Sequence, residues 1–248
     1  MKTSNPVLNE KRFLDYQSGA TTTRSGEVMT IDGTINKTLM LGLLLICTAL
    51  FTWKAYLGGA NIQGYMMGGA IGGLIMALIT IFKSEWAHIT APIYALLEGF
   101  FVGGLSAMME AMVPGIVLQA VALTFGVMFM MLAAYKSGTI RATPAFRKGI
   151  IAATGAIFVV YMISFISGLA FGTTIPYIHE GGLLGIGFSI VVVVIAALNF
   201  ILDFDFIEKA SAAGADKKME WMGAFSLMLT LVWLYIEILR LLSKLAQE

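Results

Sequence analysis

The chain has 248 residues, of which 58% are hydrophobic and only 12% are charged. An ordinary soluble domain is about 45–50% apolar and about 25% charged, so this composition excludes a soluble globular protein. Sixteen Lys and Arg against fifteen Asp and Glu give a net charge of +1, which favours neither nucleic acid nor an acidic partner. The single cysteine, Cys47, excludes an intrachain disulfide and a cysteine-based metal site.

The first 37 residues are polar and mixed in charge. They lack the short apolar core and small-residue cleavage site of a secretory signal, so the first hydrophobic helix is expected to be an uncleaved anchor. The predicted organisation is a polar cytoplasmic segment over residues 1–37, a transmembrane domain over 38–242 and a short tail over 243–248.

Seven apolar runs follow, each about 20 residues long, the length with which a helix crosses a bilayer. The runs do not alternate as barrel strands do, so the predicted fold class is an all-α polytopic membrane protein with seven transmembrane helices. Turn-forming residues such as Pro92, Pro114 and Gly214 mark breaks between runs. The predicted spans are Thr38–Leu57, Ile62–Phe82, Ile89–Met109, Gly115–Tyr135, Ile150–Phe171, Gly182–Leu202 and Met219–Leu242.

The second span carries a stripe of small residues at intervals of four, with two more glycines beside it. Such stripes let helix backbones approach closely, so tight packing against a neighbouring helix is the simpler interpretation. The alternative is a helix that slides or tilts to open a path. The stripe consists of Ala60, Gly64, Gly68 and Gly72, flanked by Gly69 and Gly73.

Lys and Arg residues are distributed unevenly between the two predicted sides of the membrane. Thirteen lie in the amino-terminal segment and the loops on its side, and three lie on the opposite side. The positive-inside rule therefore places the amino terminus in the cytoplasm. Seven crossings would leave the carboxyl terminus outside, whereas Arg240 and Lys244 favour the cytoplasm, so a re-entrant last segment is the alternative.

Four acidic residues lie within or at the edge of the apolar runs, where a charge costs several kcal/mol unless it is protonated, paired or hydrated. Glu98 is close to mid-depth in the third span, and it is either a protonated, hydrogen-bonded residue or a proton or cation site. Glu237 is about 18 residues into the last span, three residues before Arg240, so a local ion pair is available to it.

Asp203 and Asp205 close the sixth span in the stretch "LNFILDFDFIE". Residues two apart point to opposite faces of a helix, and both carboxylates would oppose the negative end of a helix dipole. Either the helix continues past Glu208, or a positive partner compensates, for which Lys83 and Lys209 are the candidates. Solvated acids at a membrane boundary are the alternative, although for Asp203 we favour a functional role.

Signatures of an enzyme are poor. The two histidines, His88 and His179, fall in predicted loops on opposite sides, so no helix presents two histidines to a metal. The stretch "GLSA" at 104–107 is not a nucleophile elbow, and no histidine lies within a span to act as its base. We expect no catalytic residues, no cofactor and no firm metal site.

The chain resembles the Bax inhibitor-1 family, also called transmembrane Bax inhibitor motif proteins, in its bacterial branch. The resemblance covers essentially all seven spans and is carried by several stretches, each weak alone but specific together. These are "SNPVLNEKRF", "MTIDGTINKT", "ALLEGFFVGG", "LNFILDFDFIE" and "MEWMGAFSLMLTLVWLYIEILRLL".

The resemblance implies a bundle in which six helices surround the last, and a pH-sensitive calcium leak gated by two aspartates that share a proton. The sixth-helix aspartate corresponds to Asp203 or, less comfortably, Asp205. Matching "AFSLMLT" places Thr230 where the seventh-helix aspartate is expected, and Glu237 follows seven residues later on nearly the same face.

The first hypothesis is a bacterial cytoplasmic-membrane protein that allows slow, pH-modulated flux of cations, calcium or protons, through these acids. The second is a non-transporting regulator that binds another membrane protein, such as a quality-control protease, through its amino-terminal segment. A proton-coupled transporter is a third hypothesis, disfavoured because no inverted repeat is visible. Only the lipid bilayer is common to all three as a partner.

Overall fold

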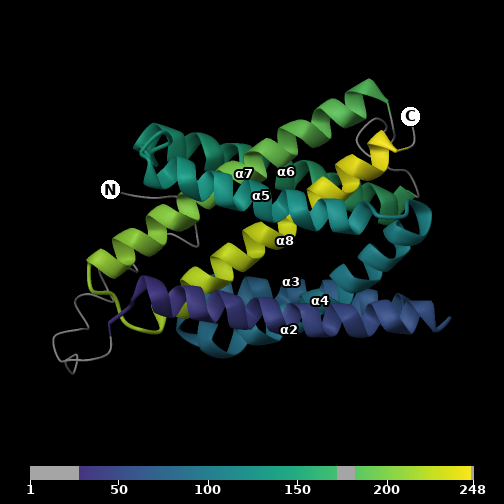
Figure 1. Cartoon of the computed structure of the whole chain (residues 1–248), viewed down its shortest axis with the longest axis horizontal. Coiled ribbons are helices and arrows are strands. Elements are labelled where there is room, and N and C mark those ends of the chain that lie inside the picture. Colours follow the sequence, from purple (N-terminus) through teal and green to yellow (C-terminus); the bar gives the residue numbers. More distant parts are fainter. Residues whose placement is uncertain (1–27, 172–181, 247–248) are drawn as a thin grey trace. The chain divides into compact units, whose positions relative to one another are not determined.

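The computed structural model is described over residues 28–171 and 182–246, and within them it consists of helices joined by short connections (Figure 1). Seven helices are long and apolar enough to cross a membrane, which confirms the predicted number of spans. A single-turn 3₁₀ helix, η1 (Ser84–Trp86), precedes the third span. The spans are α2 (Ile31–Leu57), α3 (Gln63–Phe82), α4 (Ala87–Met112), α5 (Ile116–Lys136), α6 (Pro144–Phe171), α7 (Leu183–Ala212) and α8 (Met219–Leu245).

The first helix begins at Ile31, seven residues before the predicted start. Thr30 is its N-cap: the Thr30 hydroxyl accepts a hydrogen bond of 2.9 Å from the Gly33 amide. Capping by a threonine side chain satisfies an amide that has no partner within the helix, so the helix starts here rather than at the apolar run. Residues 31–37, predicted as part of a polar segment, are therefore helical, and residues 1–27 lie outside the described residues.

Proline 92, predicted to mark a break, instead lies in the second turn of α4. Helices that span membranes tolerate proline. Here Pro92 removes a single helical hydrogen bond, the one to the His88 carbonyl four residues earlier, and α4 continues through it. As a consequence His88 lies in the first turn of α4 rather than in a loop, whereas His179 lies outside the described residues.

The last two helices are longer than predicted. Helix α7 continues ten residues beyond Leu202, to Ala212, so both aspartates lie inside it, as does Glu208. Helix α8 is continuous for 27 residues, about 40 Å at 1.5 Å per residue, which favours a complete crossing over a re-entrant segment. The predicted tail from residue 243 begins inside this helix.

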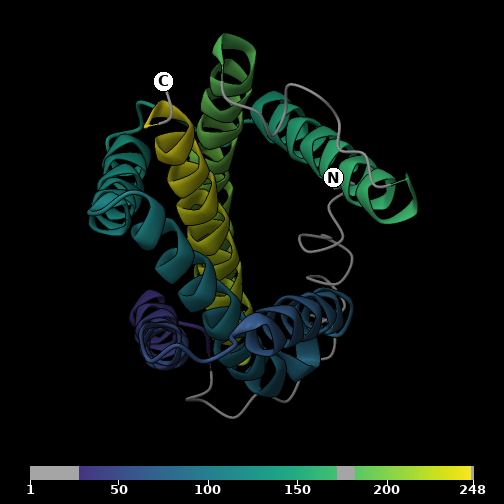
Figure 2. The same cartoon turned by 90° about the vertical axis from the view of Figure 1, so that its right-hand side faces the viewer.

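The chain divides into two compact units, and α7 and α8 contribute residues to both. The first unit contains residues 1–108 and 203–229, and its helices α2, α3 and α4 lie side by side (Figures 1 and 2). Helix α4 contacts α2 through Gly103, where a Cβ would lie only 2.5 Å from the Ala49 Cα atom. Its contact with α3 is equally close, because a Cβ on Gly69 would lie 2.5 Å from the Leu97 carbonyl oxygen.

The predicted stripe of small residues on α3 therefore has two faces. Gly69 and Gly73 pack against α4, with Gly73 beside the carboxylate of Glu98. Among the described residues, Gly64 and Gly68 have no atom within 4 Å of a Cβ position. Close packing accounts for the first pair, and sliding of this helix stays a prediction.

The second unit contains residues 109–202 and 230–248. Glu110 caps the start of α5, since its carboxylate accepts from the amides of Gly115 at 2.6 Å and Val117 at 3.1 Å. Asn199 of α7 donates to the Thr154 hydroxyl of α6 at 3.0 Å. Hydrogen bonds between such side chains hold neighbouring helices together where the hydrophobic effect cannot.

Candidate functional site

Asp203 is buried in α7, with 6% of its surface exposed. The hydroxyl of Ser226, on α8, donates to the Asp203 Oδ1 atom at 2.5 Å. Both residues belong to the first unit. A hydrogen bond to an ionised carboxylate is about twice as strong as one between neutral groups, so this contact is a polar link between α7 and α8.

Asp205 is equally buried, but it contacts a different group. The ammonium of Lys209, one turn further along α7, lies 2.8 Å from the Asp205 carboxylate. The sequence offered two ways to accommodate these acids: a helix that continues past Glu208, or a positive partner. The structure has both, since α7 continues to Ala212 and Lys209 pairs with Asp205. Lys83, the other predicted partner, lies with its ammonium 4.4 Å from the centre of the Trp86 ring, and its role as a latch partner stays a prediction.

Glu98 lies on the side of α4 that faces α3. A Cβ on Gly73 would lie 2.6 Å from the Glu98 Oε2 atom, so a larger residue at this position would require the carboxyl group to move. Tyr94, one turn earlier, is buried and packs edge-on against Phe225, with ring centres 5.1 Å apart. Over the described residues, Glu98 takes part in no hydrogen bond or ion pair, whereas each of the other three acids does.

Glu237 belongs to a polar cluster in the second unit, where only 1% of its surface is exposed. The Tyr161 hydroxyl, on α6, lies 3.0 Å from both carboxylate oxygens. Arg240 donates to the Tyr161 oxygen at 2.8 Å and to Glu237 at 3.1 Å. Lys244 donates to the Gly185 carbonyl at 3.0 Å and the Ser189 hydroxyl at 2.9 Å, both on α7.

The local Glu237–Arg240 pair that the sequence made available is thus present, with Glu237 buried and the Arg240 side chain 33% exposed. Among the described residues, no three His, Cys, Asp or Glu side chains gather closely enough to hold a metal ion. The hydrogen bonds and ion pairs described for Asp203, Asp205 and Glu237 each involve different groups.

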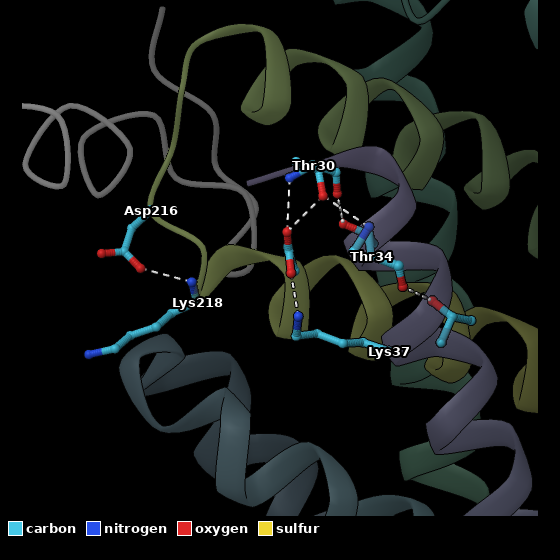
Figure 3. A network of polar contacts seen from close by, with 8 residues as sticks. Thr30, Thr34, Lys37, Asp216 and Lys218 are labelled. Atoms are coloured by element: carbon cyan, nitrogen blue, oxygen red, sulfur yellow. Dashed lines mark hydrogen bonds and ion pairs between the residues drawn. The ribbon is translucent and has the colours of Figure 1, made fainter. Parts of the chain in front are cut away.

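Sequence reasoning missed a fifth acid, Glu220, in the first turn of α8. Its carboxylate accepts from the Thr30 amide at 2.9 Å, from the Thr30 hydroxyl at 3.0 Å and from the Lys37 ammonium. Figure 3 shows Thr30 and Lys37 directed at this carboxylate from α2 and its N-cap. The signal available in the sequence was weak, consisting of a capping threonine before the first span and an acid that opens the last.

The family model described as Bax inhibitor 1 like matches residues 5–247, nearly the whole chain. The chain belongs to this family. The match confirms the resemblance recognised from the sequence stretches, and with the seven spans it makes the chain a multi-pass integral membrane protein of the Bax inhibitor 1 like family. No curated protein and no solved structure matches it.

The resemblance implies an aspartate on the last helix, α8, whereas this chain has residues with hydroxyl groups in that region. Thr230, at the expected position, is 7% exposed. Ser226 is one turn earlier on the same helix face and donates a hydrogen bond to Asp203. The spacing of four residues was the signal that could have identified Ser226 from the sequence.

Proposed function

We propose that this Bax inhibitor 1 like protein is a slow, pH-modulated leak for cations, with calcium as its principal ion. The proposed location is the cytoplasmic membrane of a bacterium, with the amino terminus in the cytoplasm. The observation that carries the proposal is the buried contact between Asp203 and Ser226, which joins two membrane-spanning helices through an ionisable group. An ionisable residue inside a membrane protein is by default a functional candidate.

Protonation of Asp203 changes the strength of this link. The ionised carboxylate accepts a charge-assisted hydrogen bond worth about 1.5–3 kcal/mol, whereas a neutral one is worth about 0.5–1.5 kcal/mol. The link is therefore strongest when Asp203 is ionised and weakens as pH falls and the carboxyl group takes up a proton. We expect the helices to separate more readily once Asp203 is protonated, so that flux increases as pH falls.

Other ionisable groups of the first unit define the electrostatic environment of this link. Asp205 is paired with Lys209, and Glu220 is paired with Lys37, so these four charges compensate one another locally. Glu98 is the remaining intramembrane acid of this unit, and we propose that it is a polar step for the ion near mid-membrane. Carboxylate oxygens replace the hydration oxygens that calcium loses on entry.

The proposal is tested by calcium entry into liposomes that carry the purified protein, stepped from pH 8 to pH 6 beside empty vesicles. Asp203→Asn keeps an acceptor for Ser226 but cannot be protonated, so its flux should no longer respond to pH. Glu208→Gln removes an exposed carboxylate from the same helix and should retain the wild-type response. Unchanged pH dependence in Asp203→Asn would contradict the gate, and flux no greater than in empty vesicles would contradict the leak.

A second candidate function is a regulator that binds another membrane protein, such as a quality-control protease, without transporting ions. It is favoured by one face of α3, where Gly64 and Gly68 lie one turn apart and no atom of the described part of the chain lies within 4 Å of a Cβ position. Paired small residues of this kind are typical of surfaces where membrane helices associate. Absence of flux from folded protein, together with a crosslink from residues 1–30 to a partner in native membranes, would favour this function. Neither proposal assigns the protein an enzymatic reaction.

A further inference from the structure

Residues 28–37 are fastened to the end of α7 and the start of α8, and we call this set of contacts the amino-terminal clasp. Val28 forms an isolated antiparallel bridge with Asp216, in the connection between the two helices. The Met29 amide donates to the Ala215 carbonyl at 2.7 Å, and its carbonyl accepts from the Ser211 hydroxyl at 3.2 Å. The backbone just before the first span is thereby bound to both helices.

The charged part of the clasp is centred on Glu220, of which 1% is exposed. Two donors from Thr30 and the Lys37 ammonium reach its carboxylate, as Figure 3 shows for the labelled donors. Gly33 completes the arrangement, because a Cβ at this position would overlap the carboxylate. Loss of one partner of a buried ion pair leaves an uncompensated charge, so the clasp depends on all of its members.

Gly223 connects the clasp to the link between Asp203 and Ser226. A Cβ on Gly223 would lie 3.0 Å from side-chain atoms of Ile207 and Thr34, and 3.5 Å from the end of Met29. Gly223 is three residues after Glu220 and three before Ser226, while Ile207 is four residues after Asp203. Residues three or four apart are neighbours on a helix face. The clasp and the Asp203–Ser226 hydrogen bond are therefore connected through successive turns of α7 and α8.

We propose that Glu220 is a positioning residue: by holding residues 28–37 on α7 and α8, the clasp keeps Ser226 on Asp203 and the leak closed. This inference rests on the proposed function and adds its regulation. A close-packed stack transmits a displacement instead of absorbing it, because protein interiors have low compressibility. Opening the clasp therefore weakens the link at any pH, and locking the clasp restrains it.

A reversible disulfide tests the clasp within one molecule. Directly paired residues of an antiparallel bridge have Cα atoms about 4.5–5.5 Å apart, within the range that a disulfide spans. We would build Val28→Cys with Asp216→Cys in a Cys47→Ala background, and use each single cysteine as a control. Oxidation should lower calcium flux at pH 6 by about fivefold or more, the lower end of typical coupling between sites, and reduction should restore it.

Opening the clasp by substitution gives the opposite effect. Glu220→Gln and Lys37→Met should raise flux at pH 8 by about fivefold, whereas Lys37→Arg keeps the charge and should behave as wild type. Rescue by the charge-conserving variant separates positioning from a general loss of structure. If the double-cysteine protein is active and its calcium flux is the same with the disulfide fully formed as with it reduced, the inference is overturned.

Hydrogen–deuterium exchange keeps this test independent of transport. The clasp predicts slower exchange at the amides of residues 203–212 and 219–229 when the disulfide is formed. If the wild-type protein carries no ions but exchange slows, the proposed function fails and the clasp stands as the restraint on these helices. Exchange that is unchanged by a complete cross-link would overturn the clasp itself.

Discussion

The intramembrane carboxylates differ in what compensates their charge. Glu237 has a tyrosine hydroxyl and an arginine within hydrogen-bonding distance, whereas the contact described above for Asp203 is a serine hydroxyl. A glycine of α3, Gly73, lies beside the Glu98 carboxyl group. A buried charge is costly in a membrane unless it is paired or hydrogen-bonded, so these different surroundings matter for each carboxylate.

The Tyr161 hydroxyl should contribute measurably to stability. Tyr161→Phe removes the group that contacts both oxygens of Glu237 and accepts from Arg240, leaving a buried carboxylate with fewer donors. We expect a loss of about 1–3 kcal/mol of unfolding free energy, the usual cost of removing a hydrogen bond to a charged group. Thermal unfolding in detergent measures this loss.

Tyr65→Phe is the matched control for this substitution. Tyr65 makes ring contacts with Phe51 and Phe100, which a phenylalanine retains, and its side chain is 44% exposed. Its melting temperature should equal that of wild type. Equal melting temperatures for both tyrosine variants would show that the Tyr161 hydroxyl does not stabilise the cluster.

Four of the five acids could be predicted, but only those partners that lie within a turn on the same helix could be predicted with them. A charged residue inside an apolar run is visible in a window of a few residues, which is how Glu98, Asp203 and Glu237 were identified. The partner of Glu220 lies 190 residues away in the chain, and no local pattern connects Thr30 with it. Lys209 was predictable because it is one turn from Asp205 on the same helix.

At the scale of helices, the seven spans follow from apolar length, whereas their ends follow from polar contacts. The start of α2 depends on the Thr30 cap, and the end of α7 lies ten residues beyond the apolar run because polar residues continue the helix. Hydrophobicity cannot locate these ends, since the residues concerned are polar. Pro92 was mistaken for a boundary for a different reason, since proline usually breaks a helix but is tolerated within one that spans a membrane.

Close packing of α4 against α2 gives a prediction about helices. Gly103→Ala places a methyl group against Ala49 and should lower stability by about 1–3 kcal/mol through overpacking. Gly68→Ala adds the same group to α3, where no atom lies within 4 Å, and should leave stability equal or slightly higher because alanine favours helix. Unfolding of both variants in detergent is the measurement, and equal losses would contradict this packing.

At the scale of the whole molecule, the distribution of Lys and Arg predicts on which side of the membrane each connection between helices lies. Lys and Arg in the described connections alternate: residues 83–86, 137–143 and 213–218 carry them, and residues 58–62 and 113–115 do not. With seven spans, this alternation predicts that the first group lies in the cytoplasm together with the amino terminus.

Single cysteines in these connections test the topology in intact cells. In a Cys47→Ala background, a membrane-impermeant thiol reagent added outside should label Gly59→Cys and fail to label Ser137→Cys and Lys217→Cys until the membrane is permeabilised. All three positions are exposed in the structure, so access to them depends on the membrane and not on burial. Labelling of Lys217→Cys from outside would reverse the orientation and place the amino-terminal clasp and the Asp203 link on the outer side. The proposed gate would then respond to external rather than cytoplasmic pH.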